Sequence, residues 1–565
     1  MKLNRYSALY TENDELPAAQ AMLIGAGLHR EDFGKPQIGI GTSGYDGNTC
    51  NMHLRELGDR IRSSVQQNGL VGWRFDTIGV SDGITNGSPG MRYSLVSREI
   101  IADSIETIAG AHGYDGIVFV AGCDKNLPGA LIAMARLNRP SLLVYGGSIR
   151  SGNFNGKKLD IVSCFEAFGK KMKGAMDEKE YRGVIDHACP GAGACGGMYT
   201  ANTMASAAEA LGMMLPGTAA FPALSEEKMQ ECDAAGAYLD NLLGKNICPR
   251  DILTPAAFRN AMVVVTVLGG STNAVLHLLA VAHAAGVKLV LDDFEKISQA
   301  TPLLADMKPS GKYLMEDLHH AGGTAVVMKT LLDKDLLDGT AMTVTGKTLA
   351  ENLEHVRVFG NDEDLFRPLD RPLHATGHIR VLRGNLAPKG AVAKITGKEG
   401  ESFSGEAIVF DSEVSMCESL RQGEIRKGHV IVIRYAGPKG GPGMPEMLKP
   451  TSAVIGAGLG PDVALITDGR FSGGSHGFVV GHISPEAFDG GAIALVHNGD
   501  RITIDAGMGE IVLHVDEKIL RERKKSWAPR KCSVQSGVLF KYARTVSDAS
   551  TGCITDSENQ DENTL

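Results

Sequence analysis

The chain has 565 residues, of which 43% are hydrophobic, 22% charged and 5% aromatic, a composition typical of soluble globular proteins. At this length we expect at least two domains with large apolar interiors. The formal net charge of −9 provides no basic surface for a nucleic acid or an anionic membrane, so a small-molecule partner is favoured.

The N-terminal segment contains no signal-like apolar run, and no apolar run in the chain reaches membrane-spanning length. Ten cysteines without those features predict a soluble protein of a reducing compartment. That compartment is the cytoplasm, or a mitochondrial or plastid matrix if a transit peptide has been removed. The segment 556–565 is acidic and lacks apolar anchors, so we expect a disordered tail there.

From about residue 15 to about 360, short apolar runs alternate with helical stretches. Runs 116–121 and 140–145 predict buried strands, and residues 255–285 have apolar side chains at helical spacing. This alternation predicts an α/β/α domain over residues 1–360, with a mostly parallel sheet covered on both faces. The segment 361–376 is charged and contains prolines, and we expect it to be a linker.

Residues 377–555 have a different pattern, with short β-rich runs separated by glycine. The expected strands are 378–382, 391–396, 407–410 and 429–434, followed by a strand pair within 493–515 around a turn at 506–509. Strand spacing of this kind predicts a β-barrel-like domain.

Three cysteines far apart in the sequence, Cys50, Cys123 and Cys195, each lie in a glycine-rich segment, and Asp124 and Lys125 follow the second of them. Thiolates favour iron–sulfur clusters, zinc or copper(I), whereas carboxylates favour magnesium, calcium or manganese. The pattern therefore predicts two metals that share one substrate. Because Cys123 follows a predicted strand, its loop is expected at the carboxyl edge of the sheet, where ligands bind in α/β folds.

Two glycine-rich loops, 437–447 and 468–477, stand out in the C-terminal half. Packing does not require so many glycines, and we expect backbone N–H groups there to approach an anion or a carboxylate. The loops contain Glu446 and Ser472. Taken singly, Glu446 and Asp82 are equally well explained as helix caps or solvated carboxylates, and Ser472 as a turn residue.

A series of motifs along the chain resembles those of the iron–sulfur dehydratase family, which includes dihydroxy-acid, sugar-acid and 6-phosphogluconate dehydratases. The matching segments are 47–53, 80–84, 97–106, 122–126, 193–202, 269–273, 438–447 and 469–477. The resemblance extends from residue 2 to about residue 556. Within the family, Asn126 and the run 196–203 favour the branched-chain enzymes, because sugar-acid members tend to carry threonine where this chain has Asn126.

The resemblance implies that Cys50, Cys123 and Cys195 hold an iron–sulfur cluster, with [2Fe-2S] favoured over [4Fe-4S]. Three cysteines leave one iron without a protein ligand, so that iron can act as a Lewis acid on a substrate hydroxyl. The resemblance also implies Mg²⁺ bound by the side chains of Asp82, Asp124, Lys125 and Glu446. Lysine is a ligand here only if it is carbamylated, because an ammonium group is a poor ligand for magnesium.

Ser472 is the general base that the resemblance implies, and it would act as an alkoxide. Its pKa must then be lowered by metal charge and by the backbone N–H groups of Gly473 and Gly474. His476 is an alternative base. The implied protein is a homodimeric hydro-lyase that converts 2,3-dihydroxyisovalerate and 2,3-dihydroxy-3-methylvalerate to 2-keto acids in valine and isoleucine biosynthesis.

Two other functions remain open from the sequence. A sugar-acid (aldonate) dehydratase would have the same fold and metal ligands, although a phosphorylated substrate would need a cluster of basic residues that these loops lack. An electron-transfer or redox-sensing protein would be favoured by four cysteines in close C-x-x-C spacing. The three separate cysteine segments do not provide that spacing.

Overall fold

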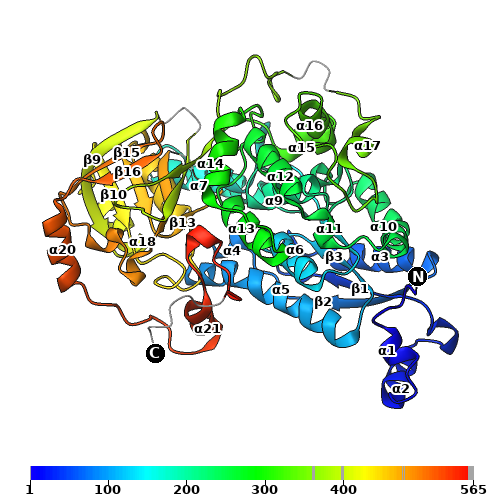
Figure 1. The fold of residues 1–565 in the computed structure, drawn as a ribbon. Helices are drawn as coiled ribbons and strands as arrows, with labels where there is room; N and C mark the ends of the chain where they lie inside the picture. Colours follow the sequence, from blue (N-terminus) through cyan, green and yellow to red (C-terminus); the bar gives the residue numbers. More distant parts are fainter. Residues whose placement is uncertain are drawn as a thin grey trace.

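The computed structural model describes residues 2–172, 174–358, 363–395, 400–473, 475 and 477–557. Figure 1 shows a helix-rich part built on the N-terminal strands and, beside it, a sheet formed by the C-terminal third of the chain. This α/β organisation, with a parallel N-terminal sheet and a barrel-like C-terminal sheet, confirms the predicted fold class.

The N-terminal sheet is entirely parallel and has the order β2-β1-β3-β4. Its strands are β1 (Gln37–Thr42), β2 (Val71–Asp76), β3 (Gly116–Ala121) and β4 (Ser141–Tyr145). Helices α3 (Leu54–Gln67) and α10 (Glu226–Lys245) pack together on one face of the sheet, and α5 (Arg92–His112) and α6 (Asn126–Leu137) pack together on the other. Every residue of β1 and β3 is buried, as expected for parallel strands between two helical layers.

Two glycines in β1 leave room for bulky aromatic side chains beside the strand. A Cβ on Gly39 would lie 2.4 Å from the ring of Tyr114, and a Cβ on Gly41 would lie 2.5 Å from the ring of Phe119. The aromatic rings therefore occupy the space that side chains of β1 would otherwise fill, and the central strand can lie close to the core.

The expected continuous helix at 255–285 is two helices, α12 (Pro255–Val267) and α13 (Asn273–Ala285). The prediction was wrong because apolar periodicity continues across a turn in which Gly269 has a φ of +69°, a conformation that glycine adopts readily. Helix α6 begins at Asn126, three residues after Cys123. Its third residue is Pro128, a position in the first turn where proline is tolerated.

The C-terminal sheet has eight strands in the order β16-β15-β9-β10-β12-β14-β8-β7. They are β7 (Ile379–Leu382), β8 (Gly390–Lys394), β9 (Ser402–Phe410), β10 (His429–Ile433), β12 (Ala464–Thr467), β14 (Phe478–Ser484), β15 (Arg501–Asp505) and β16 (Glu510–Leu513). Backbone hydrogen bonds of Arg383 with Gly509 and Ile511, both 2.8 Å, connect the end of β7 to the opposite edge. The sheet is thus nearly closed around an apolar interior, which confirms the barrel-like prediction.

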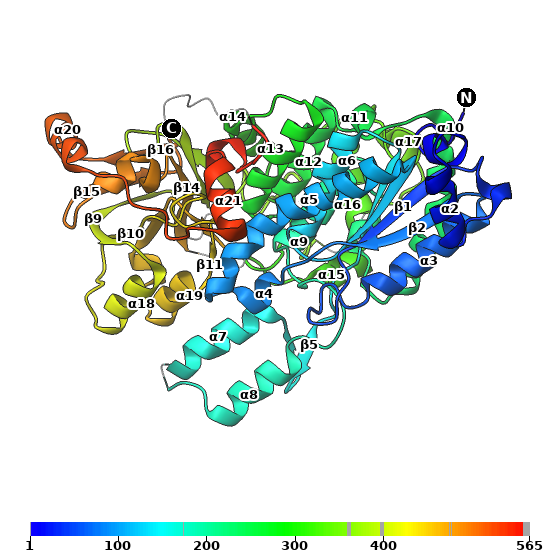
Figure 2. The same cartoon turned by 90° about the horizontal axis from the view of Figure 1, so that it is seen from below.

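The segment expected to be a linker contains an apolar pair, Leu365 and Phe366, that is buried in the N-terminal core. Near the end of the chain, α21 (Gly537–Thr545) packs against α5, as Figure 2 shows. The guanidinium of Arg98 donates hydrogen bonds to the carbonyls of Gly552 and Cys553 at 2.9 and 2.7 Å. The chain end therefore returns to the N-terminal part. The domain boundaries stay predictions, and residues 558–565 of the expected tail lie outside the described part of the chain.

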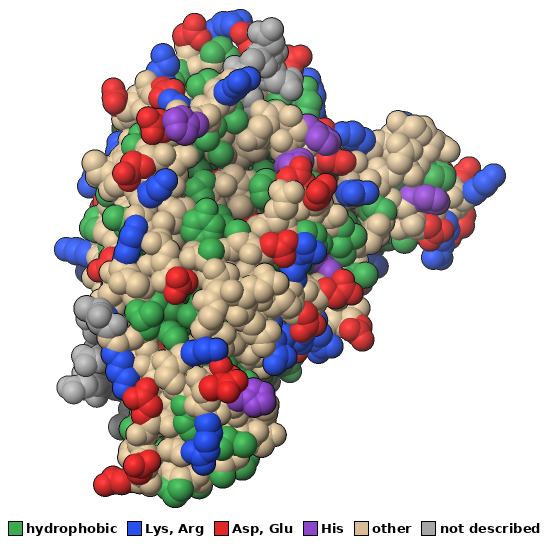
Figure 3. All heavy atoms as spheres, turned by 90° about the vertical axis from the view of Figure 1, so that its right-hand side faces the viewer, with side chains coloured by type: hydrophobic (Ala, Val, Ile, Leu, Met, Phe, Trp, Pro, Cys, Tyr) green, Lys and Arg blue, Asp and Glu red, His purple; other side chains and the backbone are tan. Residues whose placement is uncertain are grey.

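Helices α7 (Ile161–Met172) and α8 (Glu178–His187), with the hairpin of β5 (Gly152–Phe154) and β6 (Lys157–Leu159), form an arm that projects from the body in Figure 2. Further helices are α1 (Ala8–Thr11), α2 (Pro17–Gly25), α11 (Pro249–Ile252), α14 (Leu291–Ala300), α15 (Met315–His320), α16 (Gly323–Leu332), α17 (Leu349–Leu353), α18 (Glu413–Arg421), α19 (Lys449–Gly456) and α20 (Glu517–Ser526). No helix within the described ranges combines the length and apolar character that crossing a membrane requires. Acidic and basic side chains are interspersed over the face shown in Figure 3.

Candidate active site

The first two cysteines lie at the carboxyl ends of neighbouring strands. Cys50 is in the loop between β1 and α3, and Cys123 follows β3, which pairs with β1. Their side chains are 5% and 3% exposed. The third, Cys195, lies in the loop before α9 (Thr200–Ala210), where the backbone of Ile149 bonds to Ala194. Parallel pairing of β1 and β3 thus brings together two cysteines that are 73 positions apart in the sequence.

The thiol of Cys50 contacts those of Cys123 and Cys195. Hydrogen bonds with Cys123 and Cys195, reinforced by burial, raise the pKa of the Cys50 thiol well above its ordinary value. Without a cation the Cys50 thiol therefore favours the protonated form. A bound metal reverses this preference, because coordination deprotonates thiols outright.

Three carboxylates form a second cluster beside the thiols. Asp82 begins α4 (Asp82–Thr85) after β2, Asp124 follows Cys123, and Glu446 lies in β11 (Glu446–Met447). One oxygen from each carboxylate lies within 4.8 Å of the others, and all three residues are buried. Carboxylate oxygens are the ligands that Mg²⁺ prefers.

The ammonium group of Lys125, which is a cation, lies among these carboxylates. Its Nζ bonds to Asp82 and lies 3.6 Å from Asp124 and 3.5 Å from Glu446. Burial lowers the pKa of Lys125, but the three carboxylates outweigh this effect and raise it above its ordinary value. Burial raises the pKa of Asp124 to about 7, although Lys125 opposes the shift. The three buried carboxylates therefore favour positive charge beside them.

Two buried polar residues hold Glu446 in place. Strand β13 (Arg470–Phe471) pairs with β11 so that Arg470 lies opposite Glu446, and the guanidinium donates to the carboxylate at 2.8 Å. Asn273, the first residue of α13, donates its amide to the same oxygen. The backbone carbonyl of Met444 fixes the other side of the guanidinium at 2.7 Å. Neither Arg470 nor Asn273 was predicted as a site residue, although both lie within the matching motif segments 469–477 and 269–273.

Replacing Arg470 with methionine is expected to weaken Mg²⁺ binding by about 10- to 100-fold, the usual effect of removing a partner that orients a metal ligand. Isothermal titration of the purified protein with Mg²⁺ measures this directly. Arg380→Met is the matched control, because Arg380 is also buried and its guanidinium bonds to the carbonyl of Ala506 at 2.9 and 3.1 Å. Equal Mg²⁺ affinity in the two variants would contradict the positioning role of Arg470.

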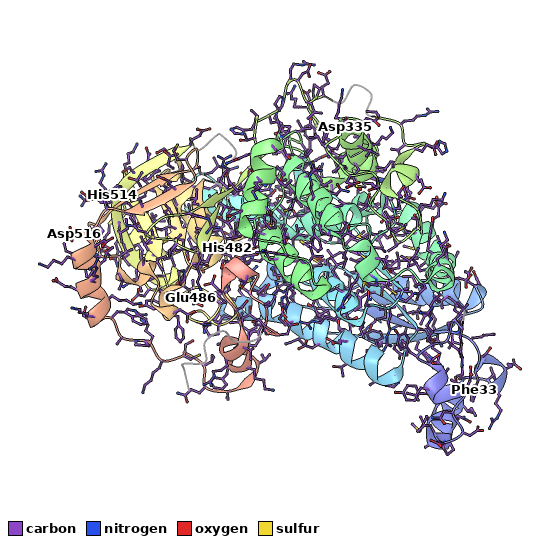
Figure 4. All side chains as sticks on the ribbon, in the orientation of Figure 1. Phe33, Asp335, His482, Glu486, His514 and Asp516 are labelled. Carbon is purple, nitrogen blue, oxygen red and sulfur yellow. The ribbon has the colours of Figure 1, made fainter. Side chains whose placement is uncertain are left out.

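The glycine-rich loop 437–447 wraps around a carboxylate of the protein itself. Glu486, labelled in Figure 4, accepts hydrogen bonds from the backbone N–H groups of Lys439 and Gly440, both at 2.8 Å. A Cβ on Gly437 would lie 2.5 Å from the same carboxylate. The expectation that these N–H groups approach a carboxylate is therefore confirmed. The carboxylate belongs to the fold and anchors the loop that carries Glu446.

Ser472 follows β13 directly, so the pairing of β13 with β11 places it beside the Glu446 strand. Gly473 permits a close approach to α9, since a Cβ there would lie 3.0 Å from the hydroxyl of Ser271 and 3.2 Å from the backbone nitrogen of Thr200. The positive end of the α9 dipole therefore lies near the serine turn and favours negative charge there. Gly474 and His476, the other residues considered for this turn, lie outside the described residues.

One cavity of about 500 Å³ collects these groups. Cys50, Cys123, Cys195, Asp82, Asp124, Glu446 and Ser472 all line it. Lys125 contacts the carboxylates behind the cavity wall. The structure thus gathers every described site residue that the sequence analysis named, and the volume is typical of a small-molecule site.

The donor set fits an iron–sulfur cluster beside a divalent cation. Three thiols and three carboxylates line the same cavity. The cysteine loops come as close as backbone allows, because a Cβ on Gly122 would lie 2.2 Å from the carbonyl oxygen of Cys50. The amide nitrogen of Asn126 is buried and has no hydrogen-bond partner among the described residues, which leaves a donor available beside the thiols.

An α/β/α part joined to a barrel-like sheet, with thiols, carboxylates and a serine around one cavity, is the arrangement of an enzyme with two sets of potential metal ligands. Family models identify the particular class. The N-terminal model of the dihydroxy-acid/6-phosphogluconate dehydratases matches residues 35–352, and the C-terminal model matches residues 364–553. The chain belongs to this dehydratase family, and it is a hydro-lyase.

Individual relatives agree along nearly the entire chain. The chain is 59% identical over 555 residues to the dihydroxy-acid dehydratase of Flavobacterium psychrophilum, which covers 98% of this chain and 100% of the relative. It is 56% identical to the chloroplastic dihydroxy-acid dehydratase of Arabidopsis thaliana, with 98% and 91% covered. The mitochondrial enzyme of Schizosaccharomyces pombe is also 56% identical, with 98% and 94% covered. The compartment of this chain stays a prediction.

Proposed function

We propose that this dehydratase acts on 2,3-dihydroxy-3-methyl carboxylic acids and forms the 2-keto acids of valine and isoleucine biosynthesis. The observation that carries the proposal is the shared cavity, in which a thiol set, a carboxylate set and Ser472 meet. The names of the relatives support the substrate class.

The wall of the cavity also favours a branched alkyl substrate. Ile149, Ile161, Val162, Phe165 and Leu448 line it. A branched aliphatic group gains from contact with such a surface, whereas each hydroxyl of a sugar acid loses hydrogen bonds to water there. The apolar wall therefore favours the dihydroxy acid over an aldonate.

In the proposed reaction the protein's own groups bind the substrate and move one proton. Ser472, as an alkoxide, takes the proton from C2, and the C3 hydroxyl leaves with its bonding electrons. The resulting enol tautomerises to the 2-keto acid. Asp82, Asp124 and Glu446 would hold Mg²⁺, with Lys125 as a further ligand if carbamylated, and the three cysteines would hold the cluster, with [2Fe-2S] favoured. When bound, these groups supply Lewis acidity to the leaving hydroxyl and positive charge to the enolate-like oxygen.

Substrate preference tests the proposal. The enzyme is purified anaerobically, reconstituted with iron and sulfide, supplied with Mg²⁺ and assayed for 2-keto acid. We expect kcat/KM for 2,3-dihydroxyisovalerate to exceed that for an aldonate by roughly tenfold or more for each additional hydroxyl buried without a partner, because each costs about 1–3 kcal/mol.

An aldonate turned over faster than 2,3-dihydroxyisovalerate would replace the branched-chain substrate with a sugar acid and leave the dehydratase assignment intact. The matched comparison uses one enzyme preparation with a measured iron content for all substrates. Differences in cluster loading then cancel from the ratio.

We also propose that the protein is a homodimer, as the family resemblance implies. Several large apolar side chains near the N-terminus are exposed, including Leu9 at 54% and Met22 at 77%, and they provide apolar surface for association. Light scattering coupled to size-exclusion chromatography measures the mass, which is 59.8 kDa for one chain.

A further inference from the structure

The loops of Cys50 and Cys123 are pressed against each other at the end of two adjacent strands. A Cβ on Gly122 would lie 2.2 Å from the carbonyl oxygen of Cys50 and 2.7 Å from Oδ1 of Asn51. Contact this close leaves little tolerance in the spacing of the two thiols. Because the loops contain many glycines, side-chain interactions must fix that spacing.

One buried side chain connects both loops. Oδ1 of Asn126 accepts the backbone N–H of Cys123 at 2.8 Å, the hydroxyl of Ser43 at 2.9 Å and Nδ2 of Asn51 at 3.2 Å. Asn51, the residue after Cys50, also donates to the carbonyl of Ser43 at 2.6 Å. Asn126 is therefore bonded directly to the Cys123 loop and, through Asn51 and Ser43, to the Cys50 loop and the end of β1.

The orientation of the Asn126 amide follows from these partners. A backbone N–H can only donate, so the atom 2.8 Å from the nitrogen of Cys123 must be the carbonyl oxygen. All three residues, Asn126, Asn51 and Ser43, are 0% exposed. A buried network in which one oxygen takes three donors is geometrically demanding, and the loss of its acceptor leaves several donors without partners.

We infer that Asn126 is a positioning residue that sets the separation of the Cys50 and Cys123 thiols before any cluster is present. The inference rests on the proposed cluster ligands. A preset pair of thiols binds a cluster without the entropic cost of ordering two glycine-rich loops. Asn126 acts through the loops, so its removal weakens cluster retention more than it weakens the fold.

The test compares two substitutions of Asn126 with a matched control. Asn126→Leu keeps approximately the same shape but has no acceptor, whereas Asn126→Asp keeps an oxygen for the Cys123 N–H. Asn260→Leu is the control, because Asn260 is also 0% exposed. It exchanges two hydrogen bonds with the backbone of Asp338, at 2.9 and 2.8 Å, away from the cysteine loops.

Each protein is reconstituted anaerobically, and iron and acid-labile sulfide per chain are measured during dilution with a chelator. We expect cluster loss to be about 10- to 100-fold faster in Asn126→Leu, the usual effect of an outer-shell substitution, and Asn126→Asp to restore much of the retention. Asn260→Leu should retain the cluster as well as the wild type, even where its thermal unfolding temperature falls as far as that of Asn126→Leu.

A second readout needs no cluster. Phenylarsine oxide binds two thiols that are held close together. Because Cys50 also contacts Cys195, the affinity of the apoprotein is measured in a Cys195→Ser background, where it reports the Cys50–Cys123 spacing, with Cys123→Ser added to that background as the blank. Asn126→Leu should lose most of this affinity, and Asn260→Leu should keep it. Gly122→Ala separates the same loops by another route and should behave like Asn126→Leu.

Equal arsenical affinity in the wild type and Asn126→Leu would overturn the inference, and so would cluster loss that merely follows unfolding temperature in all variants. A wild-type protein that assembles no cluster would instead overturn the proposed function. The arsenical measurement on the apoprotein would still decide whether Asn126 positions the two thiols.

Discussion

Cys123→Ser should abolish cluster binding and reduce dehydration to below about 1% of the wild-type rate. Thiolates bind iron–sulfur clusters, whereas a serine hydroxyl is a hard donor that stays protonated at neutral pH. Cys123 is only 3% exposed and follows β3 directly, so a small change of the side chain cannot be compensated by another ligand from solvent. Iron and sulfide content, the visible absorption spectrum and the 2-keto acid assay measure the loss.

Cys232→Ser is the matched control for this prediction. Cys232 is 0% exposed, lies in α10 and packs within the N-terminal core. Burying the hydroxyl should lower stability by about 1–3 kcal/mol, measured by urea unfolding, while iron content per folded chain stays at the wild-type level. A Cys123→Ser protein that retains its iron would remove this residue from the ligand set.

Apolar runs between turn residues indicate buried strands, and for that reason much of the N-terminal fold could be predicted. Segments 116–121 and 140–145 are β3 and β4 to within one residue. The order β2-β1-β3-β4 could not be predicted, because the apolar pattern of a buried strand does not indicate which strands it pairs with. The break between α12 and α13 was missed for a related reason, since helical periodicity on either side of Gly269 and Gly270 masks the turn.

The sequence indicated the candidate metal ligands of the site but not the residues that hold those ligands in place. Cysteines, aspartates and a glutamate in glycine-rich motifs indicate metal chemistry by themselves. Arg470 and Asn273 do not, because their role depends on the pairing of β11 with β13 and on the start of α13. Glu486 is a similar case. It lies 40 positions after Glu446 in the sequence, yet it holds the loop that carries Glu446.

Ser472→Ala should lower kcat/KM by roughly 10²- to 10⁴-fold, the usual contribution of a positioned general base. Iron content and Mg²⁺ affinity should not change, because Ser472 lines the cavity but belongs to neither ligand set. The turn that carries it meets the N-terminus of α9 next to Gly473. An alkoxide there is stabilised by the helix dipole as well as by metal charge. Steady-state kinetics on fully reconstituted protein measure the loss.

Ser475→Ala is the control for the serine prediction, because Ser475 lies in the same loop but does not line the cavity. Its hydroxyl instead lies 3.2 Å from that of Thr451. We expect this variant to keep most of its activity.

Isotope labelling tests the base in the wild type. Substrate deuterated at C2 should react more slowly if proton removal limits the rate. If proton removal is fast and reversible instead, deuterium from heavy water should appear at C2 of the recovered substrate. Both signals depend on a base at C2, and Ser472→Ala should lose the exchange. A Ser472→Ala enzyme that keeps more than a tenth of its activity would assign the base elsewhere, with His476 as the next residue to substitute.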